Sequence, residues 1–356
     1  STPEVTVGGC AAMNVNGKNA WKYGPFGEHI RAIDVLLASG DICTLTPERD
    51  APLFHAFIGG LGLLGIMTAI TVQLQRVSSG RVTIRRRSAA SLADIFTLFA
   101  EEQQMSDFLE AWLDGFAGGQ QLGRGYMTCA ALSDGADETP FPLPTPGIFE
   151  RLETPLARLA ASLGRPALLP GVRLANRANY WLDRHRPTSQ KHQRGLLAFT
   201  YWPPAAFAGY HALFPEGVET FQAFVPAPHA QAVFEQVLRF SQQQGCMPLW
   251  CVIKQHRRDP FLLSYQVDGF SLELNYQRTR QTAQTLERTL RQMIALVIEA
   301  GGRFYLAKDH FLTPAQYRQS VGDAAVDTFL RLKQCYDPEM ILQSDLFRRL
   351  FRPAPG

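Results

Sequence analysis

Glycine residues near the start of the chain offer backbone rather than side chain to a ligand. The stretch TVGGCAAMNVNGKN, residues 6–19, holds three glycines and a single charged side chain, Lys18. Glycine lets a backbone approach a ligand closely, so its N–H groups can donate hydrogen bonds to a diphosphate. A second glycine cluster, GGLGLLG, spans residues 59–65. Neither stretch matches GxGxxG or GxxxxGK[ST], so only the pair of turns together indicates a large phosphate-containing ligand.

Polar residues alternate along one expected strand later in the chain. In GFSLELNYQ, residues 269–277, apolar side chains alternate with Ser271, Glu273 and Asn275. Residues i and i+2 share one face of a strand, so these three point away from the apolar side. Neighbouring expected strands add further polar residues at Gln222, Lys254 and His256. Such a face either lies open to water or roofs a binding cavity, and the pattern leaves both possible.

The last third of the chain predicts the elements that position these polar residues. Five apolar residues on one stripe predict a helix that ends at Gly245, and four apolar residues at helical spacing predict a second helix that ends at Gly301. Strands are expected over 219–226, 247–256, 269–277 and 303–309, and helices over 228–245 and 282–302. The βαββαβ order predicts one antiparallel sheet with helices on one face.

The first third predicts a hairpin and a glycine turn that leads into a strand. Strands are expected over 30–37 and 42–46, a short helix over 49–57, and a further strand over 65–75. Residues 51–74 carry no charged side chain, so a membrane span is considered, but their glycines and the alternation in MTAITVQLQ favour the turn and strand. The segment RVSSGRV, residues 76–82, reads as a boundary.

The composition excludes several classes of protein. With 46% hydrophobic and 19% charged residues the chain is globular, and a net charge of +3 gives no reason to expect nucleic-acid binding. Six scattered cysteines without CxxC fit a reducing compartment rather than disulfides or zinc. The chain has no GxSxG or HExxH, so neither a serine nucleophile nor a metal site is expected. His29, His55 and His310 are expected to be surface or capping residues.

Both ends of the chain resemble the FAD-binding oxidoreductases of the vanillyl-alcohol-oxidase type (PCMH-type). The resemblance lies in TVGGCAAMNVNGKNAWKYGPFGEHIRAIDVLLASGDICTLTPE, LFHAFIGGLGLLGI and GGRFYLAKD, and covers residues 5–77 and 219–350. It implies an α+β fold in which a FAD-binding domain encloses a substrate domain with a large antiparallel sheet covered by helices. The implied divisions are the C-terminal half of the FAD-binding domain at 1–79, the substrate domain at 80–302 and a return to the FAD-binding domain at 303–356. Family members carry residues before TVGG, so the chain is expected to begin inside the FAD-binding domain.

The resemblance also implies positions around a bound FAD. The VGG residues would approach the diphosphate, and residues 13–18 would run beside the flavin. In GGLGLLGI, Gly62 and Ile66 would contact the cofactor. The family often has a histidine, bonded covalently to the flavin, where this chain has Asn16. Asparagine has no ring nitrogen, so noncovalent FAD is expected. The implied cofactor-binding residues are Gly8, Gly9, Met13, Val15, Asn16, Gly17, Lys18, Gly62, Ile66 and Tyr305.

Catalysis is assigned by the resemblance to Lys308 in RFYLAKD. Hydride transfer leaves negative charge on the flavin that a cation stabilises, and a buried lysine with a lowered pKa can also take the proton of an alcohol. Gln222, Lys254 and Glu273 would line the substrate pocket. Related enzymes have cysteine at the position of Glu273, so the substrate stays open.

The activity implied is removal of hydride from a secondary alcohol of a sugar, for example a polyprenyl-phosphate-linked ribose. A partner reductase would complete an epimerisation. Two alternatives remain: an aldonolactone or sugar-alcohol oxidase acting on a soluble compound, and a non-catalytic flavoprotein fragment. The electron acceptor and the oligomeric state are open.

Residues 173–194 form a basic segment. Six cationic side chains accompany one acidic residue, Asp183. This segment is either a solvated loop or helix, or a surface that attracts an anionic substrate or lipid headgroups. A cytoplasmic location is expected, with peripheral contact at the inner membrane surface.

Overall fold

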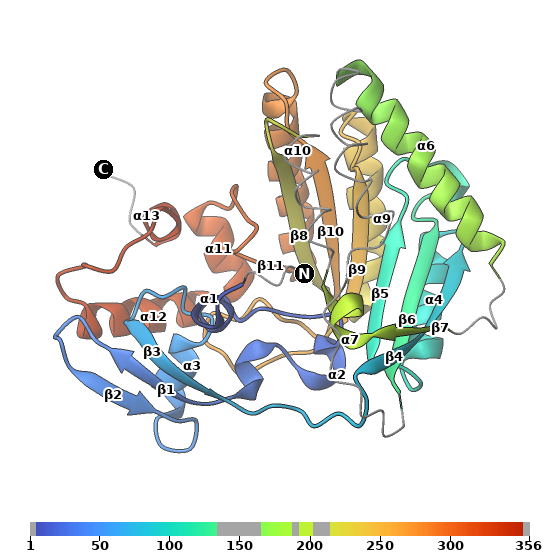
Figure 1. The fold of residues 1–356 in the computed structure, drawn as a ribbon. Helices are drawn as coiled ribbons and strands as arrows, with labels where there is room; N and C mark the ends of the chain where they lie inside the picture. Colours follow the sequence, from blue (N-terminus) through green and yellow to red (C-terminus); the bar gives the residue numbers. More distant parts are fainter. Residues whose placement is uncertain (1–4, 134–164, 187–191, 202–213, 352–356) are drawn as a thin grey trace.

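The computed structural model describes residues 5–133, 165–186, 192–201 and 214–351, which form an α+β structure built on two antiparallel sheets (Figure 1). The smaller sheet has the order β2-β1-β3, and the larger has the order β11-β8-β10-β9-β5-β6-β4-β7. Mixed helices and a large antiparallel sheet confirm the expected α+β class. The domain divisions at residues 79 and 302 stay a prediction.

The small sheet is formed by the predicted hairpin and the strand after the second glycine cluster. Its strands are β1 (Ile30–Leu36), β2 (Ile42–Leu45) and β3 (Ile66–Val72). Ile33 of β1 pairs with Leu45 on one side and Ile70 on the other, so the alternating apolar residues share a buried face. Residues 51–74 are therefore a helix, a turn and a strand, as preferred over a membrane span.

Short helices surround this small sheet. They are α1 (Val7–Ala12), α2 (Ala20–Tyr23), the 3-10 helix η1 (Phe26–His29) and α3 (Ala51–Phe57). The C-terminal helices α11 (Pro314–Val321), α12 (Asp323–Tyr336) and α13 (Asp345–Leu350) lie on the same side of the molecule, so the two ends of the chain meet there (Figure 1).

The large sheet contains the expected βαββαβ unit and four further strands. Its strands are β4 (Arg81–Ala89), β5 (Phe108–Leu113), β6 (Gly125–Leu132), β7 (His192–Gly195), β8 (Val218–Pro226), β9 (Trp250–His256), β10 (Gly269–Gln277) and β11 (Arg303–Phe304). β10 pairs with β8 and β9, which brings the polar alternations of three strands into register.

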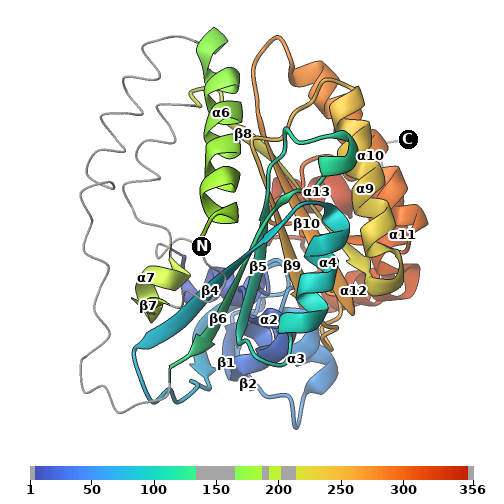
Figure 2. The ribbon, with the colours of Figure 1, turned by 90° about the vertical axis from the view of Figure 1, so that its right-hand side faces the viewer.

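Three helices cover one face of the large sheet: α4 (Leu92–Glu102), α9 (Ala227–Gln243) and α10 (Ala283–Glu299), as Figure 2 shows. The apolar stripe of α9, for example Phe234 and Val237, is fully buried. On the other side of the sheet lie α6 (Arg165–Arg184) and α7 (Leu196–Thr200). The 3-10 helix η2 (Gly119–Gln121) precedes β6 and lies next to the start of α4, where the backbone N–H of Leu92 donates to the carbonyl of Leu122. One sheet face is thus closed by apolar helices, and the polar face points the other way.

One part of the sequence differs from what its composition indicates. The proline and glycine residues of 135–172 predict long surface connections, but residues 165–172 belong to α6, and residues 134–164 lie outside the described residues. Of the basic segment, Lys191 also lies outside the described residues. None of the helices in the described ranges has the length and apolar character needed to cross a membrane.

Candidate functional site

The two glycine segments lie side by side in the structure. The backbone N–H of Gly59 donates to the carbonyl of Ala11 (3.0 Å), and that of Leu61 to the carbonyl of Ala12 (2.9 Å). Gly62 has a φ of +69°, and a Cβ at this position would meet no atom within 4 Å. The second glycine turn thus leaves open space above Gly62 and is fastened to α1 by backbone bonds.

The Gly8–Gly9 pair forms a helix start rather than the expected turn. Thr6 caps α1, and its hydroxyl accepts a hydrogen bond from the backbone N–H of Gly9 (3.1 Å). Threonine is a favoured cap residue, so it extends helical structure over both glycines. A Cβ on Gly9 would lie 2.9 Å from the Thr6 hydroxyl, whereas a Cβ on Gly8 would meet nothing within 4 Å. Gly8 therefore presents uncovered helix backbone.

Asparagine side chains fix the segment that follows α1. Asn14 accepts a hydrogen bond from the Gly27 backbone N–H (2.9 Å) and donates one to Asp259 (2.9 Å). Asn16 donates to the Tyr265 hydroxyl (3.0 Å), which donates to the Asn14 carbonyl (2.5 Å). Both asparagines are thus used to hold residues 13–18 against the loop between β9 and β10.

Tyr305 lies beside this fixed segment. Its ring centroid is 4.6 Å from that of Tyr265, and only 7% of its surface is exposed. Burial raises the pKa of the Tyr305 hydroxyl, so it stays protonated. A cavity of about 10 Å³ lies here, lined by residues that include Met13, Asn14, Gly59, Leu61, Tyr265 and Tyr305. The predicted cofactor residues Met13 and Tyr305 are therefore neighbours.

The polar face of the large sheet brings the predicted catalytic and substrate residues together. Lys308 Nζ donates to Glu273 Oε2 at 2.6 Å, and Asn275 Nδ2 donates to Glu273 Oε1 at 3.2 Å. Gln222 pairs directly with Glu273 across β8 and β10. Lys254 lies on the next strand, opposite Ser271. Glu273 is mostly buried, with 14% of its side chain exposed, so the face does not simply lie open to water.

Glu110 extends this row of charges and was missed from the sequence. Its two carboxylate oxygens lie 3.3 Å from Lys18 Nζ and 3.7 Å from Lys254 Nζ. The Lys18 amine also lies 4.9 Å from the centroid of the Phe199 ring. The signal that was available is one charged residue in the otherwise apolar strand FLEAWL. Glu110 links the predicted cofactor residue Lys18 to the predicted substrate residue Lys254.

The charges within the row shift one another's pKa values. Burial raises the pKa of Glu273, but attraction to Lys308 and Lys254 outweighs it and brings the value to about 2. Burial lowers the pKa of Lys308, and attraction to Glu273 offsets only part of that shift. Burial also raises the pKa of Glu110, and its two lysine neighbours reverse the shift. Both carboxylates are therefore ionised at neutral pH, and Lys308 loses its proton more readily than an ordinary lysine.

Two neighbouring residues complete the polar face. Gln222 is 6% exposed, and its Oε1 has no hydrogen-bond partner among the described residues. His256 bonds to the Ser271 hydroxyl (2.8 Å), and burial lowers its pKa to about 3, so its ring is neutral. A buried acceptor without a partner is uncommon in folded proteins, so Gln222 offers a hydrogen-bonding position to a ligand.

The remaining predicted residues lie around this site in different ways. Val15 and Gly17 belong to the fixed segment after α1, and Ile66 begins β3 with 53% of its surface exposed. His55 differs from the surface or capping role expected of it. Its ring contacts Phe54 and Phe261, and burial lowers its pKa.

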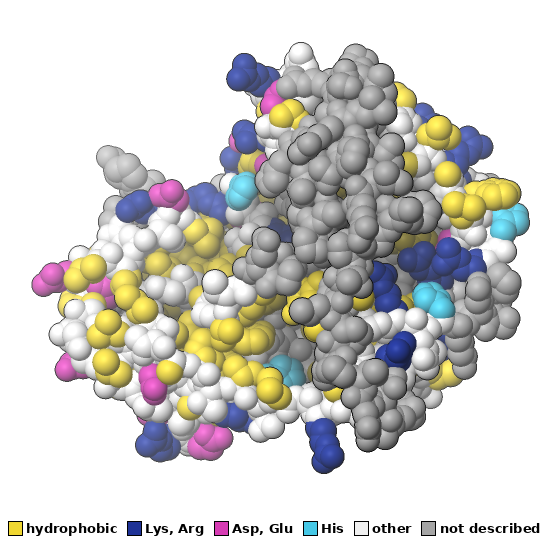
Figure 3. All heavy atoms as spheres, in the orientation of Figure 1, with side chains coloured by type: hydrophobic (Ala, Val, Ile, Leu, Met, Phe, Trp, Pro, Cys, Tyr) yellow, Lys and Arg dark blue, Asp and Glu magenta, His cyan; other side chains and the backbone are white. Residues whose placement is uncertain are grey.

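The residues present fit the FAD that the resemblance implies. Gly8 and Gly62 leave backbone uncovered on two adjoining segments, as a diphosphate requires. Hydrophobic side chains gather on the surface around α1 (Figure 3), where Val7 is 55% exposed. Tyr305 and Met13 add a buried aromatic and a flexible apolar side chain next to the polar row. These features supply donors for phosphate and apolar contact for a ring system.

Comparisons with known proteins show which proteins this chain is similar to. An uncharacterized protein from the mprA 5′ region of Streptomyces coelicolor is 29% identical, over 97% of this chain and 93% of its own length. A decaprenylphosphoryl-beta-D-ribose oxidase of Mycolicibacterium smegmatis is 26% identical, over 98% of this chain and 74% of its own. Cytokinin dehydrogenase 9 of Oryza sativa subsp. japonica is 29% identical over 32% of this chain and 21% of its own.

No protein-family model matches the chain. The similarity to the ribose oxidase nevertheless extends over nearly the whole chain, and several cytokinin dehydrogenases match part of it. These similarities agree with the resemblance to the FAD-binding oxidoreductases of the vanillyl-alcohol-oxidase type, and the cofactor is FAD.

Proposed function

We propose that this oxidoreductase takes hydride from a secondary alcohol of a sugar, with Lys308 acting at the hydroxyl group. The observation that carries the proposal is the Lys308–Glu273 pair, at 2.6 Å, in the polar face of the large sheet beside the segment that carries Tyr305. FAD, when bound, supplies a two-electron acceptor for the hydride. The chain's own residues bind the sugar and handle the proton.

Lys308 suits the role of proton acceptor. Its lowered pKa increases the fraction of neutral amine, which can take the hydroxyl proton at Nζ as the carbon loses hydride. Glu273 accepts a hydrogen bond from the same nitrogen and so fixes its position. In its charged form the same amine stabilises negative charge that develops nearby. Both roles need the amine inside the polar face, where burial and the neighbouring carboxylate hold it.

The polar face suits a substrate with several hydroxyl groups. Gln222 offers a buried acceptor that has no hydrogen-bond partner within the described part of the chain, and Lys254 and Glu110 add a donor and a further acceptor. The hydroxyl groups of a sugar ring both donate and accept hydrogen bonds, so they can pair with several side chains of this row. The similarity to the ribose oxidase makes a polyprenyl-phosphate-linked ribose the first candidate. A partner reductase would then reduce the keto sugar to its epimer, and the enzyme would work in peripheral contact with the inner face of a membrane.

A second candidate is oxidation of a soluble sugar alcohol or aldonolactone. The three lysines of the polar face, Lys18, Lys254 and Lys308, are each paired with one of two ionised carboxylates, Glu110 and Glu273, so none of them is left over for an anionic group close to the reacting carbon. This observation favours a neutral polyol at the site itself. A lipid-linked substrate is compatible only if its phosphate lies outside the row.

The experiment is anaerobic mixing of the FAD-loaded protein with each substrate class while flavin absorbance is followed. We expect purified polyprenyl-phosphate-linked ribose to bleach the flavin, and Lys308→Ala to slow bleaching by about 100-fold or more. FAD content should stay the same, because Lys308 is assigned to the substrate rather than to holding the cofactor.

Lys22→Ala serves as the control, because this part-exposed lysine pairs with Asp107 and belongs to neither the polar row nor the predicted cofactor residues. Its rate of bleaching should equal that of the unmodified protein. Bleaching by soluble polyols alone would select the second candidate. Bleaching of Lys308→Ala at the rate of the unmodified protein would show that Lys308 has no part in the reaction.

A further inference from the structure

Helix α6 turns a polar side toward the sheet and an apolar side outward. Asn176 and Asp183 are buried, with exposures of 8% and 4%, and lie on the inward side together with one aromatic residue, Tyr180, at 7%. Leu174, Trp181 and Leu182 are 70%, 58% and 59% exposed. A surface helix of a globular protein normally buries its apolar stripe. The reversed arrangement in α6 therefore requires a reason outside the core.

Contacts with the sheet fix α6 in this orientation. Asn176 Nδ2 donates to the backbone carbonyl of Leu249 at 2.8 Å. Asp183 Oδ1 lies 3.6 Å from a guanidinium nitrogen of Arg86 on β4. Rotation of the helix to bury its leucines would break both contacts and separate Asp183 from Arg86. The outward apolar face is therefore a stable feature of the fold.

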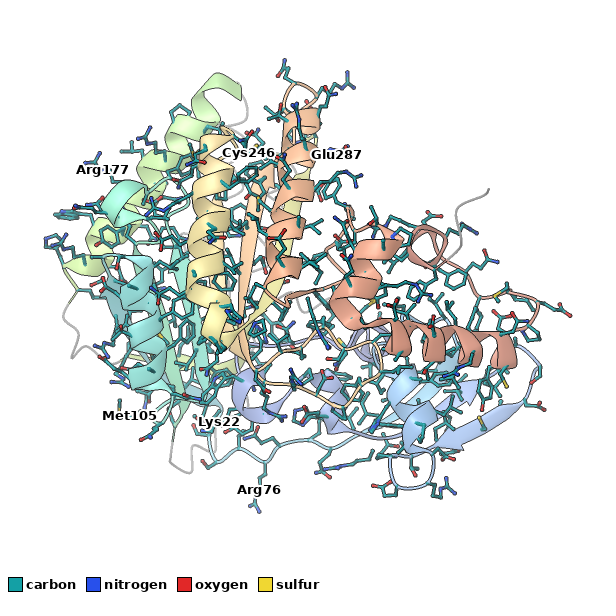
Figure 4. The ribbon with its side chains drawn as sticks, turned by 180° about the vertical axis from the view of Figure 1, so that it is seen from behind. Lys22, Arg76, Met105, Arg177, Cys246 and Glu287 are labelled. Atoms are coloured by element: carbon teal, nitrogen blue, oxygen red, sulfur yellow. The ribbon has the colours of Figure 1, made fainter. Side chains whose placement is uncertain are left out.

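Arginines line one flank of the apolar face. Arg173, Arg177 and Arg184 share one side of the helix through their spacing, and all three are exposed. Figure 4 shows Arg177 pointing outward from the molecule. The only acidic residue in the sequence of α6 is Asp183, which faces inward. The outer surface of the helix thus combines leucine and tryptophan side chains with positive charge.

We propose that the outer face of α6 docks on an anionic lipid bilayer. A helix of this kind lies in the membrane interface, with its apolar side chains in the acyl boundary and its basic side chains at the lipid phosphates. Tryptophan is enriched at that depth. The contact is peripheral, because no helix in the described ranges could cross a membrane.

The positive charge of α6 favours an anionic bilayer over a second copy of the chain as the binding partner. Two α6 helices packed face to face would bring rows of arginines close together, and like charges across an interface oppose association. An anionic bilayer offers the complementary charge and an apolar layer together. The inference rests on the proposed function for its purpose, since it would bring the enzyme to a lipid-linked sugar. Vesicle binding is measured without substrate, so its failure and the failure of the proposed activity are separate results.

The test is flotation of the FAD-loaded full chain with two kinds of vesicle, phosphatidylcholine alone and phosphatidylcholine mixed with phosphatidylglycerol. We expect binding to the mixed vesicles that weakens as salt is added. Arg177→Gln combined with Arg184→Gln should lower the partition coefficient by about 10- to 30-fold. Leu174→Gln combined with Leu182→Gln should lower it by at least about tenfold.

A matched control is Leu74→Gln combined with Arg76→Gln, which changes one exposed leucine and one exposed arginine far from α6. Figure 4 shows Arg76 at the bottom of the molecule and Arg177 at its upper left. The control should float like the unmodified protein. Absence of binding to mixed vesicles at low salt, or equal loss in the control, would overturn the proposal. The protein could instead fail to bind vesicles and form a dimer that the double variant Leu174→Gln with Leu182→Gln converts to a monomer. That result would assign the face to a second copy of the chain.

Discussion

At the scale of single residues, the pair formed by Glu273 and Lys308 determines the charge next to the proposed reaction. Lys308 and Lys254 bring the pKa of Glu273 to about 2 against the effect of burial, so its carboxylate is ionised at any working pH. That negative charge raises the pKa of Lys308 and partly offsets the lowering that burial causes. The carboxylate therefore sets the pH at which the amine becomes neutral.

Substitution of Glu273 tests this coupling. In Glu273→Gln the attraction that holds the proton on Lys308 is lost, so the pKa of Lys308 falls further. If the neutral amine takes the substrate proton, the rising limb of the rate of flavin reduction against pH should move to lower pH. Stopped-flow reduction of the FAD-loaded protein across a pH series measures the shift.

Glu287→Gln provides the control, because Glu287 pairs with Arg291 on the exposed side of α10 (Figure 4). Its pH profile should match that of the unmodified protein. A limb that moves to higher pH in Glu273→Gln, or does not move, contradicts the proton-acceptor role of Lys308.

Individual side chains could be predicted where a strand repeats a pattern. The alternation in GFSLELNYQ placed Glu273 on a polar face with Lys254 and Gln222, and the register between the strands agrees. Glu110 was missed because a lone charged residue in a strand does not reveal its partners. Tyr265 was missed because its bond to Asn16 joins residues 249 positions apart, in a loop with no repeating pattern.

At the scale of elements, apolar spacing predicted α9 and α10, since long helices with a full stripe leave little ambiguity. The short elements were harder. Adjacent glycines suggested a turn at residues 8–9, but the Thr6 cap and backbone bonds to the second glycine segment favour helix. Pro170 and Gly171 likewise suggest a loop, yet both lie inside α6.

A substitution at Gly8 can test whether α1 binds the cofactor without destabilising the folded protein. A Cβ at Gly8 meets no protein atom within 4 Å, and alanine favours helix, so Gly8→Ala should leave the folded protein as stable or slightly more stable. If the backbone of α1 approaches FAD, the added methyl group should weaken FAD binding by about tenfold, the effect of 1.4 kcal/mol. Titration of the apoprotein with FAD, followed by flavin fluorescence, measures the affinity.

Gly171→Ala is the matched control, since Gly171 also lies in a helix and a Cβ there would likewise meet no atom within 4 Å. Its FAD affinity should equal that of the unmodified protein. Equal affinities for Gly8→Ala and Gly171→Ala would remove Gly8 from the cofactor site without affecting the family assignment.

At the scale of the whole molecule, Lys333 on α12 connects the C-terminal helices to the second glycine cluster. Its side chain is fully buried, forms an ion pair with Asp337, and donates to the carbonyls of Leu63 (2.7 Å) and Leu342 (2.6 Å). A buried amine needs such partners, because an unpaired charge in the interior is costly. The end of the GGLGLLG segment is thereby held from the opposite end of the chain.

Removal of this amine should destabilise the protein strongly. In Lys333→Met the Asp337 carboxylate loses its partner inside the core, and we expect the free energy of unfolding to fall by about 3–5 kcal/mol. Urea unfolding followed by circular dichroism measures the change. The double variant Lys333→Met with Asp337→Leu should be less destabilised than the single variant. A single variant that unfolds at the same urea concentration as the unmodified protein contradicts the structural role of the pair.

The bond from Lys333 to Leu63 also bears on how the protein matures. The donor and the acceptor are separated by 270 positions, so Lys333 must leave the ribosome before the GGLGLLG segment gains this support. If this segment helps to hold FAD, newly made chains would acquire their yellow colour only after Lys333 has been synthesised. Chains stalled before Lys333 would emerge pale and would be open to proteases around residues 58–65.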